Sequence, residues 1–237
     1  MQQKIAALMP LLLVSKPFPN ASFGLWQIAE SEDYFRADLP LSEAEEAEFA
    51  RHQNPLRRLE WLAGRWLLHK LTEVPERLAL AKDAFSKPFF PENDRLGCSL
   101  SHSRGTVGAL VLDGRSEQGL PPAIGCDIQR STPKMAKLAY KFLNEPEQEF
   151  VAKFPEADHL ELFHLFWTAK ESLYKAYGLK ELDFRKHILV GPFTWDGMQG
   201  QGTGRIEKGS FSQLFQLNYG KLMLPDEEAL LYAIAVA

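Results

Sequence analysis

The longest regular apolar pattern in the chain predicts a helix in its second half. Leu162, Phe166, Ala169, Leu173 and Ala176 follow one another at spacings of four and three residues, which is typical of the buried stripe of a helix. We therefore expect a long helix over about residues 157 to 177, with one side packed into a core.

Shorter patterns predict further helices and strands in both halves of the chain. Ser42 and Glu45 form a capping box, which opens a helix that runs to about residue 53. Pro55 suits the first turn of a helix that runs to about residue 71, and two more helices are expected at 133–143 and 145–154. Strands are expected at 24–30, 78–85, 96–100, 106–112, 123–129, 184–190, 204–207, 214–217 and 229–235. Helices mixed with antiparallel strands predict an α+β fold.

The composition is that of an ordinary globular protein. The chain has 237 residues, of which 45% are hydrophobic and 24% are charged, and its formal net charge is -4. Neither half carries an excess of basic residues, which excludes a basic nucleic-acid-binding module. The turn-rich segment 117–122 is the best linker, and it divides the chain into residues 1–120 and 121–237.

The sequence favours a cytoplasmic protein without a membrane anchor. Its two cysteines, Cys98 and Cys126, form neither a disulfide framework nor a metal-binding motif, which suits a reducing compartment. The apolar run 5–14 resembles a signal peptide only loosely, because Pro10 interrupts it and no clear small-residue cleavage site follows. No run approaches the roughly 20 apolar residues that cross a bilayer.

Two acidic residues and one lysine form the main candidate site. Glu171 and Lys175 lie four residues apart on the predicted long helix, so both project from one patch of its surface. A carboxylate and an ammonium held in this way can bind a metal ion and a phosphate together, although a solvated ion pair gives the same spacing. Asp127 lies among small and apolar residues near the end of a predicted strand, where a charge is paired, binds a metal or caps a turn.

Together, these segments resemble two motifs of the 4'-phosphopantetheinyl transferase family. Residues 125–129 (GCDIQ) are similar to its G-x-D-x-E strand, and residues 167–175 (WTAKESLYK) are similar to its W-x-x-K-E-x-x-x-K helix. The resemblance is to the larger, single-chain type that activates surfactin synthetase. It implies two similar α+β halves related by a pseudo-twofold axis, with the active site in the cleft between them.

The resemblance also assigns coenzyme A contacts to the first half of the chain. The family has a G-K-P motif whose lysine reaches the coenzyme A phosphates; here Ser86 replaces the glycine, and Lys87 keeps the role. An S-H-S motif follows, whose serine and histidine contact coenzyme A, and these roles pass to Ser101 and His102. A polar hairpin turn has the same composition. Arg65 is either a further phosphate contact or a solvated arginine.

The reaction implied is transfer of 4'-phosphopantetheine from coenzyme A to a serine of an apo acyl or peptidyl carrier protein, with release of adenosine 3',5'-bisphosphate. Asp127 and Glu171 are expected to bind Mg²⁺, and Lys175 is expected to stabilise negative charge on the phosphates. Glu171, or a metal-bound water, is the candidate base for the incoming serine.

One residue departs from the family's metal-binding pattern. Gln129 stands where the family has a third acidic ligand. It offers a neutral oxygen but cannot act as a base, so we expect an active enzyme with a magnesium site of two carboxylates. The alternative is a non-catalytic relative that binds coenzyme A or a carrier protein. A monomer is expected, because two halves of one chain can build the cleft.

Other lysines allow more than one interpretation. Lys170 is either another phosphate contact or a surface charge. Lys134, Lys137 and Lys141 lie in the segment 133–154, an expected docking element for the acidic helix of a carrier protein. A solvated helix face explains these three lysines equally well.

Overall fold

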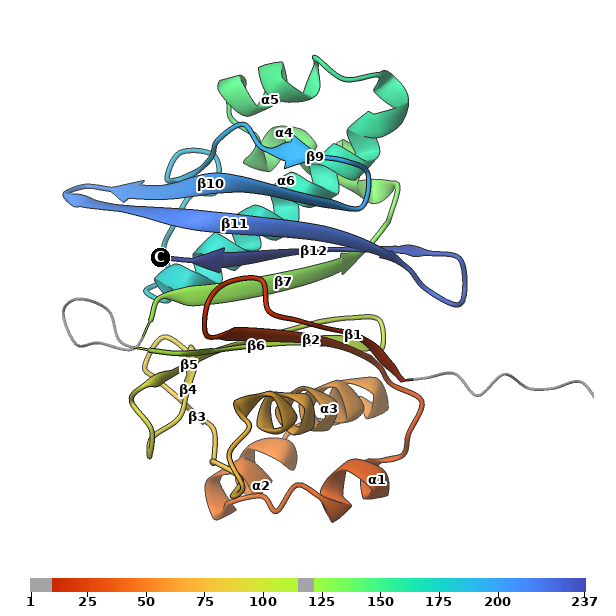
Figure 1. Cartoon of the computed structure of the whole chain (residues 1–237), viewed down its shortest axis with the longest axis vertical. Helices are drawn as coiled ribbons and strands as arrows, with labels where there is room; N and C mark the ends of the chain where they lie inside the picture. Colours follow the sequence, from red (N-terminus) through yellow and green to blue (C-terminus); the bar gives the residue numbers. More distant parts are fainter. Residues whose placement is uncertain (1–9, 115–121) are drawn as a thin grey trace, which may run out of the picture.

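The computed structural model describes residues 10–114 and 122–237 as an α+β fold. The predicted linker therefore falls outside the described residues except for Pro122. The chain before this gap and the chain after it each build an antiparallel sheet with a long helix on it (Figure 1).

The first half holds three helices within its described residues, namely α1 (Glu32–Ala37), α2 (Glu43–Phe49) and α3 (Pro55–Thr72). Its strands are β1 (Leu11–Ser15), β2 (Ala21–Gln27), β3 (Ala81–Lys82), β4 (Pro88–Phe89), β5 (Leu96–Ser103) and β6 (Thr106–Asp113). The order β1-β2-β6-β5 makes one antiparallel sheet, and β3 pairs with β4. Helix α3 lies across one face of this sheet (Figure 1).

The described part of the second half begins with the strand that carries Asp127. Its strands are β7 (Ile124–Arg130), β8 (Ile188–Val190), β9 (Thr194–Trp195), β10 (Gln199–Lys208), β11 (Phe211–Met223) and β12 (Ala229–Val236). Its helices are α4 (Lys134–Phe142), α5 (Glu145–Val151) and α6 (Glu156–Tyr177). The antiparallel sheet has the order β7-β12-β11-β10-β8, with β9 beside β10. Strand β7 is therefore at an edge of this sheet.

Helix α6 confirms the long apolar stripe, and its ends follow from local chemistry. Leu162, Phe166, Ala169 and Leu173 are each at most 1% exposed and pack in the core of the second half. The helix ends at Gly178, which has a φ of 75° that glycine adopts without steric cost. The position of α6, which carries Glu171 and Lys175, is thus fixed by burial along most of the helix.

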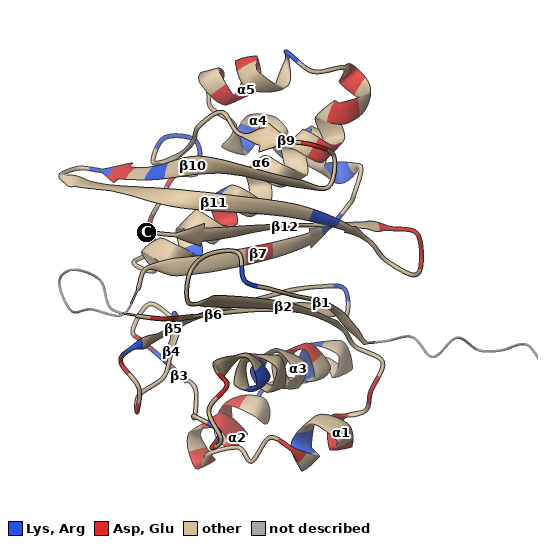
Figure 2. Ribbon diagram, in the orientation of Figure 1, with Lys and Arg blue, Asp and Glu red and all other residues tan. Residues whose placement is uncertain are grey.

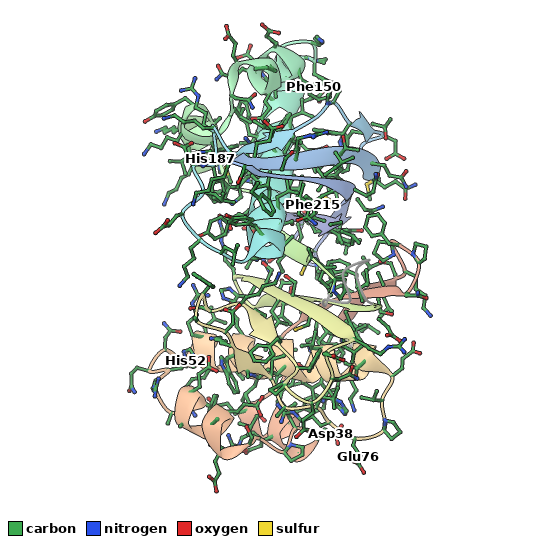
Figure 3. All side chains as sticks on the ribbon, turned by 90° about the vertical axis from the view of Figure 1, so that its left-hand side faces the viewer. Asp38, His52, Glu76, Phe150, His187 and Phe215 are labelled. Atoms are coloured by element: carbon green, nitrogen blue, oxygen red, sulfur yellow. The ribbon has the colours of Figure 1, made fainter. Side chains whose placement is uncertain are left out.

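The two sheets share a core between them. Strands β2 and β6 contribute Phe23, Leu25 and Leu110, and these pack against Ile128 of β7 and Ile234 of β12. In Figure 1, β7 is the strand of the second sheet that lies nearest the first sheet. Figure 3 shows Phe215 inside the second half, in a separate core between the second sheet and α6. Burial on both sides fixes the position of β7.

Several of the predicted elements differ in extent from the structure: β10 and β11 are longer than expected, β2 begins and ends earlier, and α5 ends at Val151. Three other elements are also shorter than predicted. Residues 78–80 form no strand, because the backbone N–H of Leu80 donates to the buried carboxylate of Glu45 instead of to a neighbouring strand. The strand expected at 184–190 is reduced to β8, because the Asp183 side chain accepts from two backbone N–H groups and holds a turn. The helix opened by the predicted capping box ends at Phe49.

None of the helices in the described ranges has the length and apolarity that crossing a bilayer requires.

Candidate active site

Strand β7 and helix α6 approach each other so closely that only glycine fits at one point. A Cβ atom on Gly125 would lie 2.0 Å from the carbonyl oxygen of Ser172 on α6. Alternation along β7 then directs Asp127, two residues further on, toward the same helix. The glycine of the predicted motif therefore allows the contact between strand and helix on which the site depends.

The structure brings Asp127 and Lys175 into direct contact. Lys175 Nζ donates to Asp127 Oδ1 at 2.8 Å and to the carbonyl oxygen of Cys126 at 3.0 Å. Asp127 is 7% exposed. Burial alone would lower the pKa of Lys175, but the Asp127 carboxylate outweighs it and raises that pKa above its ordinary value. Lys175 is therefore a cation at neutral pH.

Glu171 lies one helical turn before Lys175, in surroundings that disfavour the ionised form of its carboxyl group. Burial and the nearby Asp127 carboxylate raise the pKa of Glu171 to about 7, and Lys175 offsets only part of this shift. Its carboxyl group has no hydrogen bond to any residue in the described ranges. A second positive charge near the two carboxylates would relieve their repulsion.

Strand β5 brings the predicted Ser101 and His102 to the site, but on opposite sides of the strand. Ser101 Oγ donates to Asp127 Oδ1 at 2.8 Å. The His102 side chain instead faces α3, where Arg57 Nη1 lies 2.7 Å from its Nδ1 atom. Partial burial and Arg57 lower the pKa of His102, although Glu60 opposes them. Successive residues of a strand alternate between its two faces, so Ser101 contacts Asp127 whereas His102 contacts α3.

A cavity of about 460 Å³ joins Asp127 and Lys175 to the first half of the chain. Most ionisable groups in its lining are basic: His52, Arg57, Arg65, Lys82, His102 and Lys175. The acidic residues of its lining are Glu60 and Asp127. Figure 3 shows His52 on the first half of the molecule. A cavity with this excess of basic groups suits an anionic ligand that carries several phosphates.

Arg65 lines this cavity but is not the solvated arginine that the sequence allowed. It is 5% exposed, its Nη2 lies 3.0 Å from Glu48 Oε2, and its guanidinium stacks 3.4 Å from the centre of the Trp61 ring. Burial lowers the pKa of Arg65 to about 10, so it keeps its charge. Figure 2 shows the acidic helix α2 beside α3, which explains this pairing.

Lys87 reaches across to the second half of the chain. Its Nζ donates to the carbonyl oxygen of Ala176, in the last turn of α6, at 2.7 Å. Burial lowers the pKa of Lys87 below its usual value. The preceding Ser86 has a φ of 74°, which glycine favours. The turn thus keeps a glycine-like shape although serine has replaced the glycine.

Four of the predicted catalytic, metal-binding and phosphate-binding positions lie outside the lining of the 460 Å³ cavity: Lys87, Glu171, Lys170 and Gln129. Lys170 is fully buried, lies 2.8 Å from Glu147, and donates to the carbonyl oxygens of Phe184 and Ile188 at 2.7 Å each. Both sequence interpretations of Lys170 were therefore wrong, and its role is structural. Gln129 is partly buried, and its Nε2 donates to the carbonyl oxygen of Arg130 at 3.0 Å.

The metal-binding groups in the site are few. Within the described ranges, no three His, Cys, Asp or Glu side chains come together to hold a metal ion. Asp127 and Glu171 remain a closely coupled pair of carboxylates, and oxygen ligands of this kind suit Mg²⁺.

Sequence reasoning missed Glu60, which lines the cavity. Arg57 belongs to the basic stretch 51–82, which allowed either a phosphate-facing patch or a solvated helix face. Arg57 and Glu60 lie three residues apart on α3, and Arg57 Nη1 lies 3.1 Å from Glu60 Oε2. Glu60 is buried and also accepts from the backbone N–H of Gly105 at 3.0 Å. The spacing of three residues between Arg57 and Glu60 is visible in the sequence and predicts that their side chains meet on one side of the helix. Their contact with His102 depends on tertiary structure and had no sequence signal.

Comparisons with known proteins give one family. Residues 123–220, which include β7 and α6, match the 4'-phosphopantetheinyl transferase superfamily. The chain is 33% identical over 139 residues to 4'-phosphopantetheinyl transferase AcpT of Salmonella typhi, which covers 56% of this chain and 66% of that protein. It is 34% identical over 128 residues to AcpT of Escherichia coli O157:H7, covering 52% and 59%. These matches span less than two thirds of each relative.

Proposed function

We propose that this chain, which belongs to the 4'-phosphopantetheinyl transferase superfamily, transfers 4'-phosphopantetheine from coenzyme A to a serine of an apo acyl or peptidyl carrier protein. Adenosine 3',5'-bisphosphate is the other product. The protein would thus act as a holo-carrier-protein synthase. The subtype that activates surfactin synthetase, with its twofold relation between residues 1–120 and 121–237, is part of the same proposal.

The observation that carries the proposal is the Asp127–Lys175 contact in the lining of a basic cavity. Transfer from a pyrophosphate requires that negative charge be neutralised where it increases, and that the nucleophile lose its proton. Lys175 supplies a fixed positive charge. Glu171, with a pKa of about 7, can accept a proton near neutral pH. We assign it as the base for the carrier serine.

We assign Mg²⁺ binding to Asp127 and Glu171, with Gln129 as a neutral third group. The repulsion that raises the pKa of Glu171 supports this assignment, because a bound cation would remove it. The ion, when bound, would neutralise phosphate charge and orient the leaving group. A Gln129→Glu variant with unchanged Mg²⁺ dependence would count against any metal role for this position.

We place the phosphates of coenzyme A in the basic cavity. His102, Arg57 and Lys175 line it and provide donors for phosphate oxygens. Arg65 is a weaker candidate, because Glu48 already pairs with it. Lys87 would have to leave the carbonyl oxygen of Ala176, or contact the ligand alongside it.

A smaller cavity of about 200 Å³ adjoins the basic one and also includes Lys175. Phe85, Leu100 and Tyr174 contribute apolar surface to its lining. We place the pantetheine arm there, because this arm is uncharged and mostly apolar. In this arrangement, the reacting phosphate lies beside Lys175, where the two cavities meet.

The carrier protein would dock on α4. Leu138 and Tyr140 are 41% and 64% exposed on this helix, and the lysines at 134, 137 and 141 are exposed beside them. Apolar and basic groups complement the acidic, partly apolar helix that a carrier presents near its serine. We propose a cytoplasmic monomer, in keeping with Cys98 and Cys126, which are both unpaired.

The test is intact mass spectrometry of an apo carrier protein incubated with this protein, coenzyme A and Mg²⁺. We expect a mass gain of one phosphopantetheine, which is lost with EDTA and with the Glu171→Ala variant. Acyl and peptidyl carriers should both be used.

The alternative function is binding without transfer. The glutamine at position 129 favours it, because this position supplies a third acid in the family motif. Coenzyme A binding without modification of either carrier would support this alternative and contradict the proposed transfer.

A further inference from the structure

The edge of β7 that faces β5 is capped by side chains instead of a strand. Antiparallel pairing with β12 uses the backbone groups of one edge of β7, so alternate N–H groups point away from its sheet. Three serines of β5 accept these donors: Cys126 N to Ser99 Oγ at 3.0 Å, Ile128 N to Ser101 Oγ at 3.2 Å, and Arg130 N to Ser103 Oγ at 3.1 Å. The two halves are thus joined by a row of hydroxyl groups.

Ser101, unlike Ser99 and Ser103, also contacts the Asp127 carboxylate. Its oxygen accepts from the N–H of Ile128, and its proton is donated to Asp127 Oδ1 at 2.8 Å. A hydroxyl group has a single proton, so Ser101 is fully committed as a donor by this bond. Ser101 is also buried, at 8% exposure. Its hydroxyl is therefore used within the protein and is not free for an additional donor bond to a phosphate.

Both donors to the Asp127 carboxylate use the same oxygen atom. Ser101 Oγ and Lys175 Nζ each lie 2.8 Å from Oδ1. Within the described ranges, Oδ2 has no hydrogen-bond partner. Two donors on one oxygen fix the rotation of the carboxylate and leave the other oxygen available as a ligand.

We propose that Ser101 is a positioning residue for the cation site, which orients Asp127 so that Oδ2 can bind a divalent cation, and that it is not a coenzyme A contact. This inference rests on the proposed function, since it assumes that Asp127 binds the cation of that reaction. It replaces the role that the S-H-S resemblance gave to Ser101. Partners that orient a metal ligand commonly contribute about 10–100-fold to metal affinity.

The experiment compares Ser101→Ala with the matched control Ser99→Ala. Each variant removes one hydroxyl acceptor of a β7 N–H group, but only the first removes a donor to Asp127. Mn²⁺ is titrated into each purified protein and followed by the electron paramagnetic resonance signal of the free ion. Coenzyme A binding is measured by calorimetry in EDTA, and the thermal midpoint of each protein is recorded.

We expect Ser101→Ala to weaken Mn²⁺ binding by about tenfold, and Ser99→Ala to leave it within about twofold. Both variants should lower the thermal midpoint by similar amounts and leave coenzyme A binding unchanged. Ser101→Cys, which keeps the volume but is a weaker donor, should weaken Mn²⁺ binding too and serves if the alanine variant does not fold.

Three results would overturn the inference. These are equal Mn²⁺ affinity in Ser101→Ala and the wild type, equal weakening by Ser99→Ala, or no Mn²⁺ binding by the wild type. Weaker coenzyme A binding with unchanged Mn²⁺ binding would restore Ser101 as a coenzyme A contact. If the Mn²⁺ results are as expected but no carrier protein is modified, only the proposed function is contradicted. The inference about Ser101 would stand, because ion binding is measured without turnover.

Discussion

Among single residues, Glu171 is partly buried, and its surroundings oppose the negative charge of its carboxylate. Its pKa of about 7 means that the folded protein, without a bound cation, resists ionisation of this carboxyl group. The same property suits a base that must take a proton near neutral pH. Glu171 should therefore reduce stability while it supports activity, as functional groups often do.

Glu171→Gln should stabilise the cation-free protein at pH 8. The folded pKa is raised above the ordinary value of 4.5, so the wild type is most favoured below pH 4.5 and loses stability as pH rises through about 7. We expect the variant to be more stable by about 1–3 kcal/mol at pH 8, and the difference to shrink at pH 5. Urea unfolding in EDTA at both pH values measures this. An equal difference at both values would contradict the assigned pKa.

Gly125→Ala should disrupt the contact of β7 with α6. The new Cβ would lie 2.0 Å from the carbonyl oxygen of Ser172, so strand and helix must separate, at a cost of about 1–3 kcal/mol or more. Gly64→Ala on α3 is the control, because its Cβ meets Leu100 at an ordinary 3.5 Å and alanine favours a helix by about 1 kcal/mol. The midpoint temperature of thermal unfolding should fall for Gly125→Ala and should not fall for Gly64→Ala. Equal shifts would contradict this account of Gly125.

The residues of the site were predictable where a local pattern carried them. The i,i+4 spacing of Glu171 and Lys175 placed both on one side of α6, and the structure brings Lys175 to Asp127. Patterns could not reveal that Arg65 would be enclosed by the acids of α2, since that depends on how two helices pack. For the same reason, the contact of Ser101 with Asp127 had no signal within either motif.

Among the elements, α6 was the most predictable, because its apolar stripe spans the whole helix. The strand predicted over residues 78–85 is confirmed only at β3; it does not include residues 78–80, because the buried side chain of Glu45 satisfies the N–H of Leu80, which a local pattern cannot show. Helix α6 also separates two roles for its lysines. Lys170 points into the core beside Glu147, and Lys175 points to Asp127.

Lys170→Met and Lys175→Met should therefore give opposite phenotypes. Removing Lys170 leaves the Glu147 carboxylate buried without its partner, which typically costs about 3–5 kcal/mol. Lys175 is partly exposed, so Lys175→Met should cost less stability but lower the rate of carrier modification by at least about tenfold. Urea unfolding and initial rates on the folded fraction test both expectations. A stable Lys170→Met protein that is inactive would return Lys170 to the catalytic machinery.

In the whole molecule, the candidate active site lies where the two halves meet. Ser101 and His102 come from the first half, and Asp127, Glu171 and Lys175 come from the second. The contact is extensive, because Phe23 and Leu25 of β2 share a core with Ile128 of β7. The sequence predicted the α+β class and a site between two halves, but it gave no signal for this shared core.

The shared core predicts that the halves unfold together. Separation would expose the apolar faces of β2 and β7 to water, so neither half should remain folded when the other melts. Scanning calorimetry should show a single transition whose calorimetric and van't Hoff enthalpies agree. Two resolved transitions would show instead that residues 1–120 and 121–237 are independent domains.

The most direct test of the central claim is the initial rate of holo-carrier formation by the wild type and by Glu171→Gln, at saturating coenzyme A and Mg²⁺ and pH 8. Circular dichroism of both proteins would confirm that they are equally folded. We predict that the variant is at least about 100-fold slower, as expected when a general base is removed. A variant that forms holo-carrier at the wild-type rate would contradict the assignment of the chemistry to this site.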